Sequence, residues 1–301
     1  MSTIAFVACV EQGPLERQAL LLCRSIRRFA GRYADAPIYT FQPREGTAIT
    51  RDTAIQLADL GVRHSGERLN RAFAHYAIGN KIFASARAEE LASEDILVFL
   101  DSDTVIVGEP RAFELGDGID AAVRPVEFHH SSAEPESDDD PFWHTRFRRV
   151  SSAGPGDPMD GYWLRMYELL HIEERPFVET ARSGQRIRAY FNSGLVAVRR
   201  SAGLFAQWRD DFLGLMTVSH IPRKGPLHYM DQLSLAATLT RVWSRVAVLD
   251  HRYNYGLPAR DLDGEPLRPI EREGLVHIHY NSMFETVARW LEPQLAEAAC
   301  S

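Results

Sequence analysis

The first 126 residues alternate between continuous apolar runs and stretches with helical spacing of apolar positions. Ile4–Val10 is an apolar run that predicts a buried strand, and Pro14 opens a periodic stretch to Phe29 that predicts a helix. A second helix is expected over Ala74–Ala92. Further strands are predicted at Pro37–Phe41, Asp95–Leu100, Thr104–Val107 and Ala121–Val126. This order predicts an α/β fold with a mostly parallel central sheet flanked by helices.

The pattern breaks between Glu127 and Asp160, where Ser, Pro, Gly and acidic residues dominate. This segment is expected to be a loop, either merely solvated or acting as a lid or acceptor-binding loop. The remainder is less regular, and Ser201 is a candidate N-cap for a helix to about Met216. The other elements expected are strands at Arg188–Val198, Val246–Leu249 and Leu275–Tyr280, and helices starting near Met230 and Met283.

Composition narrows the function classes. The 301 residues are 45% apolar and 25% charged, as in an ordinary globular chain. The net charge of -7 argues against a nucleic-acid partner, although a local pocket can still bind a small polyanion. The chain has too few cysteines for a disulfide framework, namely Cys9, Cys23 and Cys300. Cys9 is expected to pack in the core rather than to react. With neither a leader peptide nor a transmembrane segment visible, a cytoplasmic protein is expected.

Two carboxylates follow the predicted strand that ends at Leu100. Asp101 and Asp103 stand at i and i+2, so they can point to one side and hold a hard divalent cation. Such an ion bridges nucleotide phosphates and offsets charge on a leaving diphosphate. Asp-x-Asp also occurs at Asp138–Asp140 and Asp261–Asp263, but only Asp101–Asp103 follows a buried strand. Because ligands gather at the carboxyl ends of parallel strands, this position favours a metal site.

Two polar residues and a glycine interrupt a second apolar run that predicts a strand. Asn192-Ser193-Gly194 lies inside Tyr190–Val198, where polar groups are costly unless something uses them. The asparagine amide can bind sugar hydroxyls as donor and acceptor, and the glycine permits close approach; a simple turn is the alternative.

Two later segments offer further polar groups. His277 and His279 face the same way in a strand, and either imidazole could complete a metal site begun by two carboxylates. Asp231 and Gln232 lie at a predicted helix start, where Asp231 could simply favour the helix dipole or face a bound ligand.

In chain order, the four motifs are Asp-x-Asp after a strand, Phe-Asn-Ser-Gly, Asp-Gln and a late His-Tyr. This ordered set resembles the retaining glycosyltransferases of the nucleotide-diphospho-sugar transferase superfamily, which have the GT-A fold. The glycogenin and lipopolysaccharide-galactosyltransferase type, family eight, is the most similar over roughly residues 1–285. The resemblance implies that Asp101 and Asp103, with Ser102 between them, bind the donor and an Mn²⁺ or Mg²⁺ ion. It further implies that His279, in a His-Tyr pair, is the third metal ligand.

The same resemblance implies roles for the other residues. Asn192 would contact the donor sugar, Asp231 and Gln232 would lie by the anomeric carbon, and Lys81 would be a basic residue that meets the donor. The end of the first strand, Ala8, Cys9 and Val10 up to Glu11, would cradle the nucleobase and ribose. The implied donor is a nucleotide-sugar, with UDP as the expected nucleotide. The implied acceptor is a hydroxyl group of a glycan, a lipid-linked molecule or a small molecule.

A single catalytic domain over residues 1–301 follows from the resemblance: a nucleotide-binding half (1–126), a variable loop (127–160) and an acceptor and metal-completing half (161–301). The family often has Gly and then Lys-Pro-Trp after the His-Tyr pair, to grip the diphosphate. Here Asn281-Ser282-Met283-Phe284 follows, without a lysine, so the phosphate grip is unassigned. For a retaining reaction, Asp231 could be a nucleophile or Gln232 could stabilise front-side attack, and the sequence leaves both open.

Two other functions fit parts of the sequence. Asp101–Ile106 and Gly116–Asp120 resemble the first and last acidic motifs of haloacid-dehalogenase-type phosphatases, but too few residues separate them for the crossovers required. A non-catalytic sugar-nucleotide-binding or scaffold protein on the same fold is the alternative, and it would be expected to lose the metal ligands that are intact here.

Overall fold

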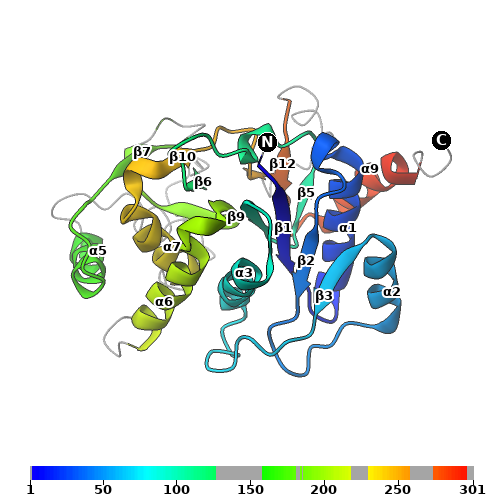
Figure 1. Cartoon of the computed structure of the whole chain (residues 1–301), viewed down its shortest axis with the longest axis horizontal. Coiled ribbons are helices and arrows are strands. Elements are labelled where there is room, and N and C mark those ends of the chain that lie inside the picture. Colours follow the sequence, from blue (N-terminus) through cyan, green and yellow to red (C-terminus); the bar gives the residue numbers. More distant parts are fainter. Residues whose placement is uncertain are drawn as a thin grey trace, which may run out of the picture.

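The computed structural model describes residues 2–126, 158–180, 184, 186–217, 230–257 and 274–296. Its centre is a seven-stranded sheet with the strand order β10-β6-β9-β4-β1-β2-β3 (Figure 1). The strands are β1 (Ile4–Cys9), β2 (Ile38–Phe41), β3 (Val62–Ser65), β4 (Ile96–Leu100), β6 (Ala121–Pro125), β9 (Phe191–Arg199) and β10 (Val246–Val248).

β9 is antiparallel to both of its neighbours, β4 and β6. In the described residues, the other strands of this sheet all run in one direction. The sheet is therefore mostly parallel, as predicted. β4 and β6 share a direction, so the carboxyl end of one lies at the opposite sheet edge from the amino end of the other.

Helices cover both faces of the sheet (Figure 1). Alternate residues of β1, such as Ala5 and Val7, join the hydrophobic core under α3, α6 and α7. The residues between them, such as Phe6 and Ala8, join the core under α1. This period-2 division is what a strand buried on both faces requires. The helices are α1 (Pro14–Phe29), α2 (Arg51–Asp59), α3 (Asn80–Leu91), α6 (Leu204–Thr217) and α7 (Met230–Thr240).

Two smaller sheets complete the described chain. The three-stranded sheet has the order β11-β12-β5, and it packs with α9 and α1 around a third core that contains Val105, Ile278 and Leu291. The two-stranded sheet pairs β7 with β8. The bounds of these elements are β5 (Thr104–Ile106), α5 (Pro158–Leu169), β7 (Phe177–Glu179), β8 (Arg186–Arg188), β11 (Tyr255–Gly256), β12 (His277–His279) and α9 (Phe284–Ala296).

Several boundaries predicted from the sequence are wrong. Ser201 does not cap a helix: it lies in the 3-10 turn Arg200–Ala202, which ends at Gly203 with a left-handed φ of 66°. The helix expected from Ala74 begins at Asn80, after a short 3-10 turn. The strand expected over Arg188–Val198 is divided between β8 and β9, because the chain turns between the two sheets.

The loop predicted over Glu127–Asp160 lies outside the described residues as far as residue 157, and its last three residues begin α5. The elements that were not predicted are α2, α5, β3, β7 and β11. Cys23 is buried and Cys9 is partly buried, while Cys300 lies outside the described residues.

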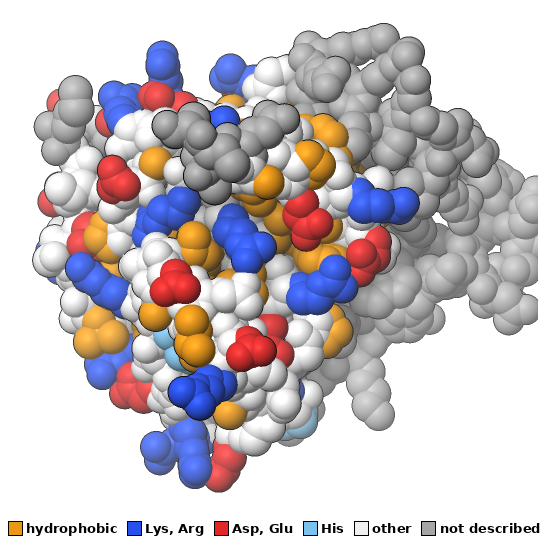
Figure 2. All heavy atoms as spheres, turned by 90° about the vertical axis from the view of Figure 1, so that its right-hand side faces the viewer, with side chains coloured by type: hydrophobic (Ala, Val, Ile, Leu, Met, Phe, Trp, Pro, Cys, Tyr) orange, Lys and Arg blue, Asp and Glu red, His pale blue; other side chains and the backbone are white. Residues whose placement is uncertain are grey.

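The face built by α1, α2 and α9 carries basic and acidic side chains interspersed with single apolar ones (Figure 2). None of the helices in the described ranges has both the length and the apolar character needed to span a membrane.

Candidate functional site

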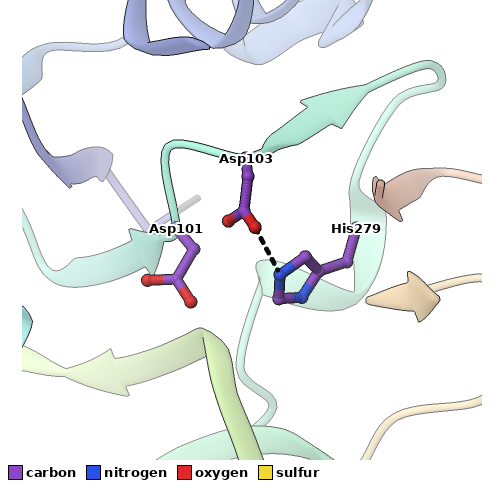
Figure 3. Close-up of side chains that lie close together, drawn as sticks. All are labelled: Asp101, Asp103 and His279. Carbon is purple, nitrogen blue, oxygen red and sulfur yellow. Dashed lines mark ion pairs between the residues drawn. The ribbon is translucent and has the colours of Figure 1, made fainter. Parts of the chain in front are cut away.

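Asp101 and Asp103 occupy the turn that leaves the carboxyl end of β4 and enters β5. β12 pairs with β5 in antiparallel register, with His279 opposite Thr104, so this pairing brings His279 beside Asp103. His279 Nε2 lies 3.2 Å from Asp103 Oδ2. Each of the three side chains offers one ligand atom, and these atoms lie within 4.8 Å of one another. Figure 3 shows both carboxylates and the imidazole turned into the same space.

The two histidines of β12 differ in their surroundings. His277 is 0% exposed, and its Nδ1 accepts a hydrogen bond from the backbone N–H of Asn254 at 3.2 Å. Burial lowers the pKa of His277 well below its ordinary value, which keeps the ring neutral. Of the two, it is His279 that joins Asp101 and Asp103 in the group able to hold an ion.

Lys81 links the Asp101–Asp103 turn to the start of α7. Its ammonium lies 2.7 Å from Asp101 Oδ2 and 3.7 Å from Asp231 Oδ2, and it donates to Ser193 Oγ at 3.1 Å. Burial acts to lower the pKa of Lys81, but the carboxylates of Asp101 and Asp231 outweigh it and raise the pKa. The ammonium of Lys81 therefore bridges the two carboxylates.

The Asp231 carboxylate is buried and is surrounded by hydrogen-bond donors. Its Oδ2 accepts from Ser193 Oγ at 2.6 Å, and its Oδ1 accepts from the Tyr76 hydroxyl at 3.1 Å. Gln232 is 5% exposed, and its Oε1 has no hydrogen-bond partner among the described residues. The two neighbours therefore differ: each oxygen of the Asp231 carboxylate accepts a hydrogen bond, whereas the Gln232 amide oxygen has no such partner in the described part of the chain.

Asn192 and Gly194 lie on β9 next to the Asp101–Asp103 turn, since Asp101 N–H donates to the Gly194 carbonyl at 3.0 Å. The Gly194 N–H in turn donates to Asn192 Oδ1 at 2.9 Å. A Cβ at position 194 would lie 2.7 Å from Cε1 of His279, a distance that real Cβ atoms essentially never show. The glycine is therefore required for the close approach of the imidazole.

The charges of the three predicted ligands depend on one another. Burial raises the pKa of Asp101, and Lys81 opposes that rise. At Asp103, burial also acts to raise the pKa, but the neighbouring His279 outweighs it and the pKa is lowered. At His279, burial acts to lower the pKa, but Asp103 and Asp101 outweigh it and the pKa is raised. The cluster favours a cation beside its carboxylates, whether a proton on His279 or a metal ion.

The end of β1, which was predicted to hold the nucleobase and ribose of the donor, lies beside this cluster. Ala8 and Val10 are buried in the core under α1, so they could reach a ligand only through backbone groups. Cys9 is partly buried, and burial together with the Asp101 carboxylate raises the pKa of its thiol. Glu11 is 2% exposed and accepts from Arg44 Nε at 2.9 Å and from Asn80 Nδ2 at 3.0 Å.

Ser102 lies between the two carboxylates and is partly exposed; its Oγ is 3.5 Å from Gln18 Oε1. Sequence reasoning missed Asn254, which contacts both Asn192 and His279. It also missed Tyr76, the hydroxyl donor to Asp231. Neither residue stands in an apolar strand or a recognisable motif, so only the tertiary contacts reveal them.

The acidic motif considered for a phosphatase serves another purpose. Asp120 precedes the amino end of β6, whereas Asp101 follows the carboxyl end of the co-directional β4, so they lie at opposite sheet edges. The Asp120 carboxylate is 2% exposed and forms an ion pair with Arg245 at 2.8 Å. Its role is structural.

Comparisons with known proteins agree with this architecture. The family model for the Rhodobacterales glycosyltransferase domain matches residues 6–242. The apo structure of the bifunctional glycosyltransferase WbbM aligns with a TM-score of 0.54 at 15% identity, covering 93% of this chain and 46% of that chain. This chain thus spans less than half of the length of WbbM. The likeness concerns the fold, and with the strand order it identifies the GT-A architecture predicted from the sequence.

Two further structures align at lower scores. Mouse xyloside xylosyltransferase 1 in its apo form has a TM-score of 0.48 and 12% identity, covering 93% of this chain and 98% of that chain. The glycosyltransferase GlyE of Streptococcus pneumoniae TIGR4 has a TM-score of 0.47 and 15% identity, covering 93% and 55%. A search of curated protein sequences gives no match.

Proposed function

The chain belongs to the Rhodobacterales glycosyltransferase domain family and is therefore a glycosyltransferase, and from this premise we propose that its transfer depends on a divalent cation held by Asp101, Asp103 and His279. The proposed donor is a UDP-sugar, and the proposed outcome is retention of configuration, as in the family-eight type. The proposed acceptor is a hydroxyl group of a glycan, lipid-linked or small molecule.

The three side chains fit a divalent ion in spacing and in chemistry. Two ligands of one ion cannot be further apart than two metal–ligand bonds, about 4.2 to 5.2 Å for hard divalent ions. The three ligand atoms lie within 4.8 Å of one another, so little movement is needed to close on an ion. Carboxylates suit Mn²⁺ and Mg²⁺, and the imidazole adds affinity for a transition metal, which favours Mn²⁺.

A bound divalent ion would neutralise the charge that develops on the departing nucleoside diphosphate. Lys81 would supply a second positive charge at the same place, because its ammonium lies 2.7 Å from Asp101 Oδ2. Asn192 and the backbone at the end of β1 would orient the donor sugar and the nucleoside. These groups are fixed before the substrate arrives, which is how preorganised polar groups stabilise a transition state.

We assign different roles to Asp231 and Gln232. Both oxygens of Asp231 already accept hydrogen bonds, from Ser193 and Tyr76, and these hydrogen bonds reduce the nucleophilicity of the carboxylate. Gln232 Oε1 lacks a partner within the described ranges, so it is the freer oxygen to stabilise positive charge at the anomeric carbon. This supports front-side attack assisted by Gln232, with Asp231 positioning Lys81 and the sugar.

The proposed division of labour follows the chain. Residues 1–126 would bind the nucleotide, residues 127–160 would form a variable loop, and residues 161–301 would complete the metal site and hold the acceptor. The single observation that carries the proposal is the approach of His279, from β12, to the Asp101–Asp103 turn.

Thermal melting with UDP, GDP, CDP and dTDP, each with and without Mn²⁺, tests the proposal. A nucleotide at a hundred times its dissociation constant adds about 2.7 kcal/mol of stability, which raises the melting temperature of a large domain by roughly 5 °C. We expect a Mn²⁺-dependent shift with UDP that Asp103→Asn abolishes. Asp210→Asn, at a side chain that is 59% exposed on α6, is the control and should keep the shift.

Each other outcome has a definite meaning. A shift with a different nucleotide would keep the metal site and replace the donor base. Equal shifts in wild type and Asp103→Asn would refute the metal assignment. Mn²⁺-dependent binding without nucleotide release from UDP-glucose, UDP-galactose, UDP-xylose or UDP-N-acetylglucosamine, with glycan or sugar acceptors present, would favour the non-catalytic binding protein instead.

A further inference from the structure

Asn254 joins two strands that carry predicted site residues. It lies directly before β11, is 5% exposed, and uses both atoms of its amide. Its Nδ2 donates to Asn192 Oδ1 at 2.9 Å, and its Oδ1 lies 3.2 Å from His279 Nδ1. The Asn254 side chain therefore connects Asn192 on β9 with the imidazole of His279 on β12.

The direction of these hydrogen bonds is fixed by a backbone group. The Gly194 N–H can only donate, so the atom of Asn192 that it meets at 2.9 Å is the carbonyl Oδ1. That same oxygen must also accept from Asn254, which orients the Asn254 amide with its NH₂ toward Asn192. Asn254 Oδ1 then faces His279, and because a carbonyl oxygen can only accept, Nδ1 of His279 carries a hydrogen.

The backbone of Asn254 is fixed as firmly as its side chain. Its φ of 48° is in the left-handed region, which asparagine tolerates better than most residues. Its N–H donates to His277 Nδ1 at 3.2 Å, and its carbonyl accepts from the buried Arg124 at 2.6 Å. His277 thereby acquires a role: it holds the bend that presents Asn254 to His279.

We propose that Asn254 is a positioning residue that accepts the Nδ1–H of His279 and thereby turns Nε2 toward Asp103. The inference rests on the proposed function, because Nε2 is then the atom offered to the divalent ion. A metal-bound imidazole needs its second nitrogen to donate to a fixed acceptor, which sets the tautomer and the ring orientation. Asn254 supplies that acceptor from a neighbouring strand.

The first test uses metal-free protein. In ¹⁵N-histidine-labelled protein, ¹H–¹⁵N correlation detects a ring N–H where a hydrogen bond protects it from exchange with water. We expect a protected Nδ1–H at His279 in wild type and its loss in Asn254→Gly. Glycine keeps the left-handed backbone and removes the amide. Asn254→Asp retains an acceptor and should restore the protected Nδ1–H.

Asn281→Gly is a matched control. Asn281 also has a left-handed φ, of 50°, and lies two residues after His279, but among the described residues its amide donates only to the His279 backbone carbonyl, at 3.4 Å. This variant should keep the protected Nδ1–H. Absence of a protected Nδ1–H at His279 in wild type, or its retention in folded Asn254→Gly, would overturn the proposal. If Asn254→Gly does not fold, loss of Nδ1–H in Asn254→Asp would overturn it.

The second test measures Mn²⁺ affinity by electron paramagnetic resonance of the free ion. Loss of a group that orients a metal ligand lowers affinity by about 10- to 100-fold, and we expect this in Asn254→Gly but less than a twofold change in Asn281→Gly. Unchanged affinity in folded Asn254→Gly would overturn the proposal. Wild type that binds no Mn²⁺ would instead refute the metal site, while the Nδ1–H measurement would still decide the role of Asn254.

Discussion

The substitution Gly194→Ala tests whether the approach of His279 to β9 is as close as the structure has it. The added Cβ would lie 2.7 Å from His279 Cε1, 2.8 Å from its Nδ1 and 2.9 Å from Asn192 Oδ1. Ordinary contact begins at 3.4 Å. The imidazole and the amide would therefore have to move by about 0.5 to 0.7 Å in a close-packed interior.

The expected cost is worked out from that displacement. Overpacking a well-packed site costs about 1–3 kcal/mol, and the lower entropy of the unfolded alanine chain offsets about 0.4–1 kcal/mol of it. The net cost is up to about 2.6 kcal/mol, so the melting temperature should fall by up to about 5 °C. Metal–ligand distances are specified to about 0.2 Å, so the shift of His279 should weaken Mn²⁺ binding by at least about tenfold.

Gly256→Ala is the matched control. Gly256 lies on β11 in register with His279 on β12, yet a Cβ there meets nothing within 4 Å. Calorimetric melting of the metal-free proteins and titration with Mn²⁺ should leave Gly256→Ala close to wild type. If Gly194→Ala matches Gly256→Ala in both measurements, the close approach of His279 to β9 is refuted.

Three other substitutions test the charges and roles of single residues. Lys81→Met leaves the carboxylates of Asp101 and Asp231 without their ammonium, so urea unfolding at neutral pH should show a loss of about 3–5 kcal/mol; a loss below about 1 kcal/mol would contradict the bridging role. At Glu16, burial acts to raise the pKa, but hydrogen bonds from backbone N–H groups and a threonine hydroxyl outweigh it and lower the pKa from 4.5 to about 2. The stability that Glu16 adds is therefore complete above pH 4.5 and lost as the pH falls toward 2, and Glu16→Gln should flatten acid unfolding over that interval, whereas an unchanged slope would contradict the assignment. Gln232→Ala should lower kcat for sugar transfer by about 10²-fold with little change in the donor KM; a change confined to KM would refute the role of Gln232 in the transition state.

The sequence was most informative where local residues decide the structure. A five-residue apolar run followed by Asp-x-Asp predicts both the buried strand β4 and the polar turn at its end, and the structure has both. Pro14 and the periodic residues after it define α1 with its predicted bounds. Local signals were also overlooked: Thr50 caps α2 by accepting from the Thr53 N–H, a start signal visible in the sequence.

The relation between His277 and His279 shows where local reasoning stops. Alternation along a strand places both rings on one side, and both do contact Asn254. Only the antiparallel pairing of β12 with β5 decides that His279 lies beside Asp103. That register depends on the core that α1, β5, β12 and α9 build together, which no local window contains.

The sequence by itself determined the fold class, the polar ends of β4 and β9, and the residue types available for chemistry, because strand and helix formation follow from near neighbours. The tertiary structure decided which of those groups meet. Lys81 between Asp101 and Asp231, Gly194 against His279, and Asn254 between β9 and β12 all join segments far apart in the chain. Such contacts depend on how layers pack and strands pair, and their geometry is set by the whole core.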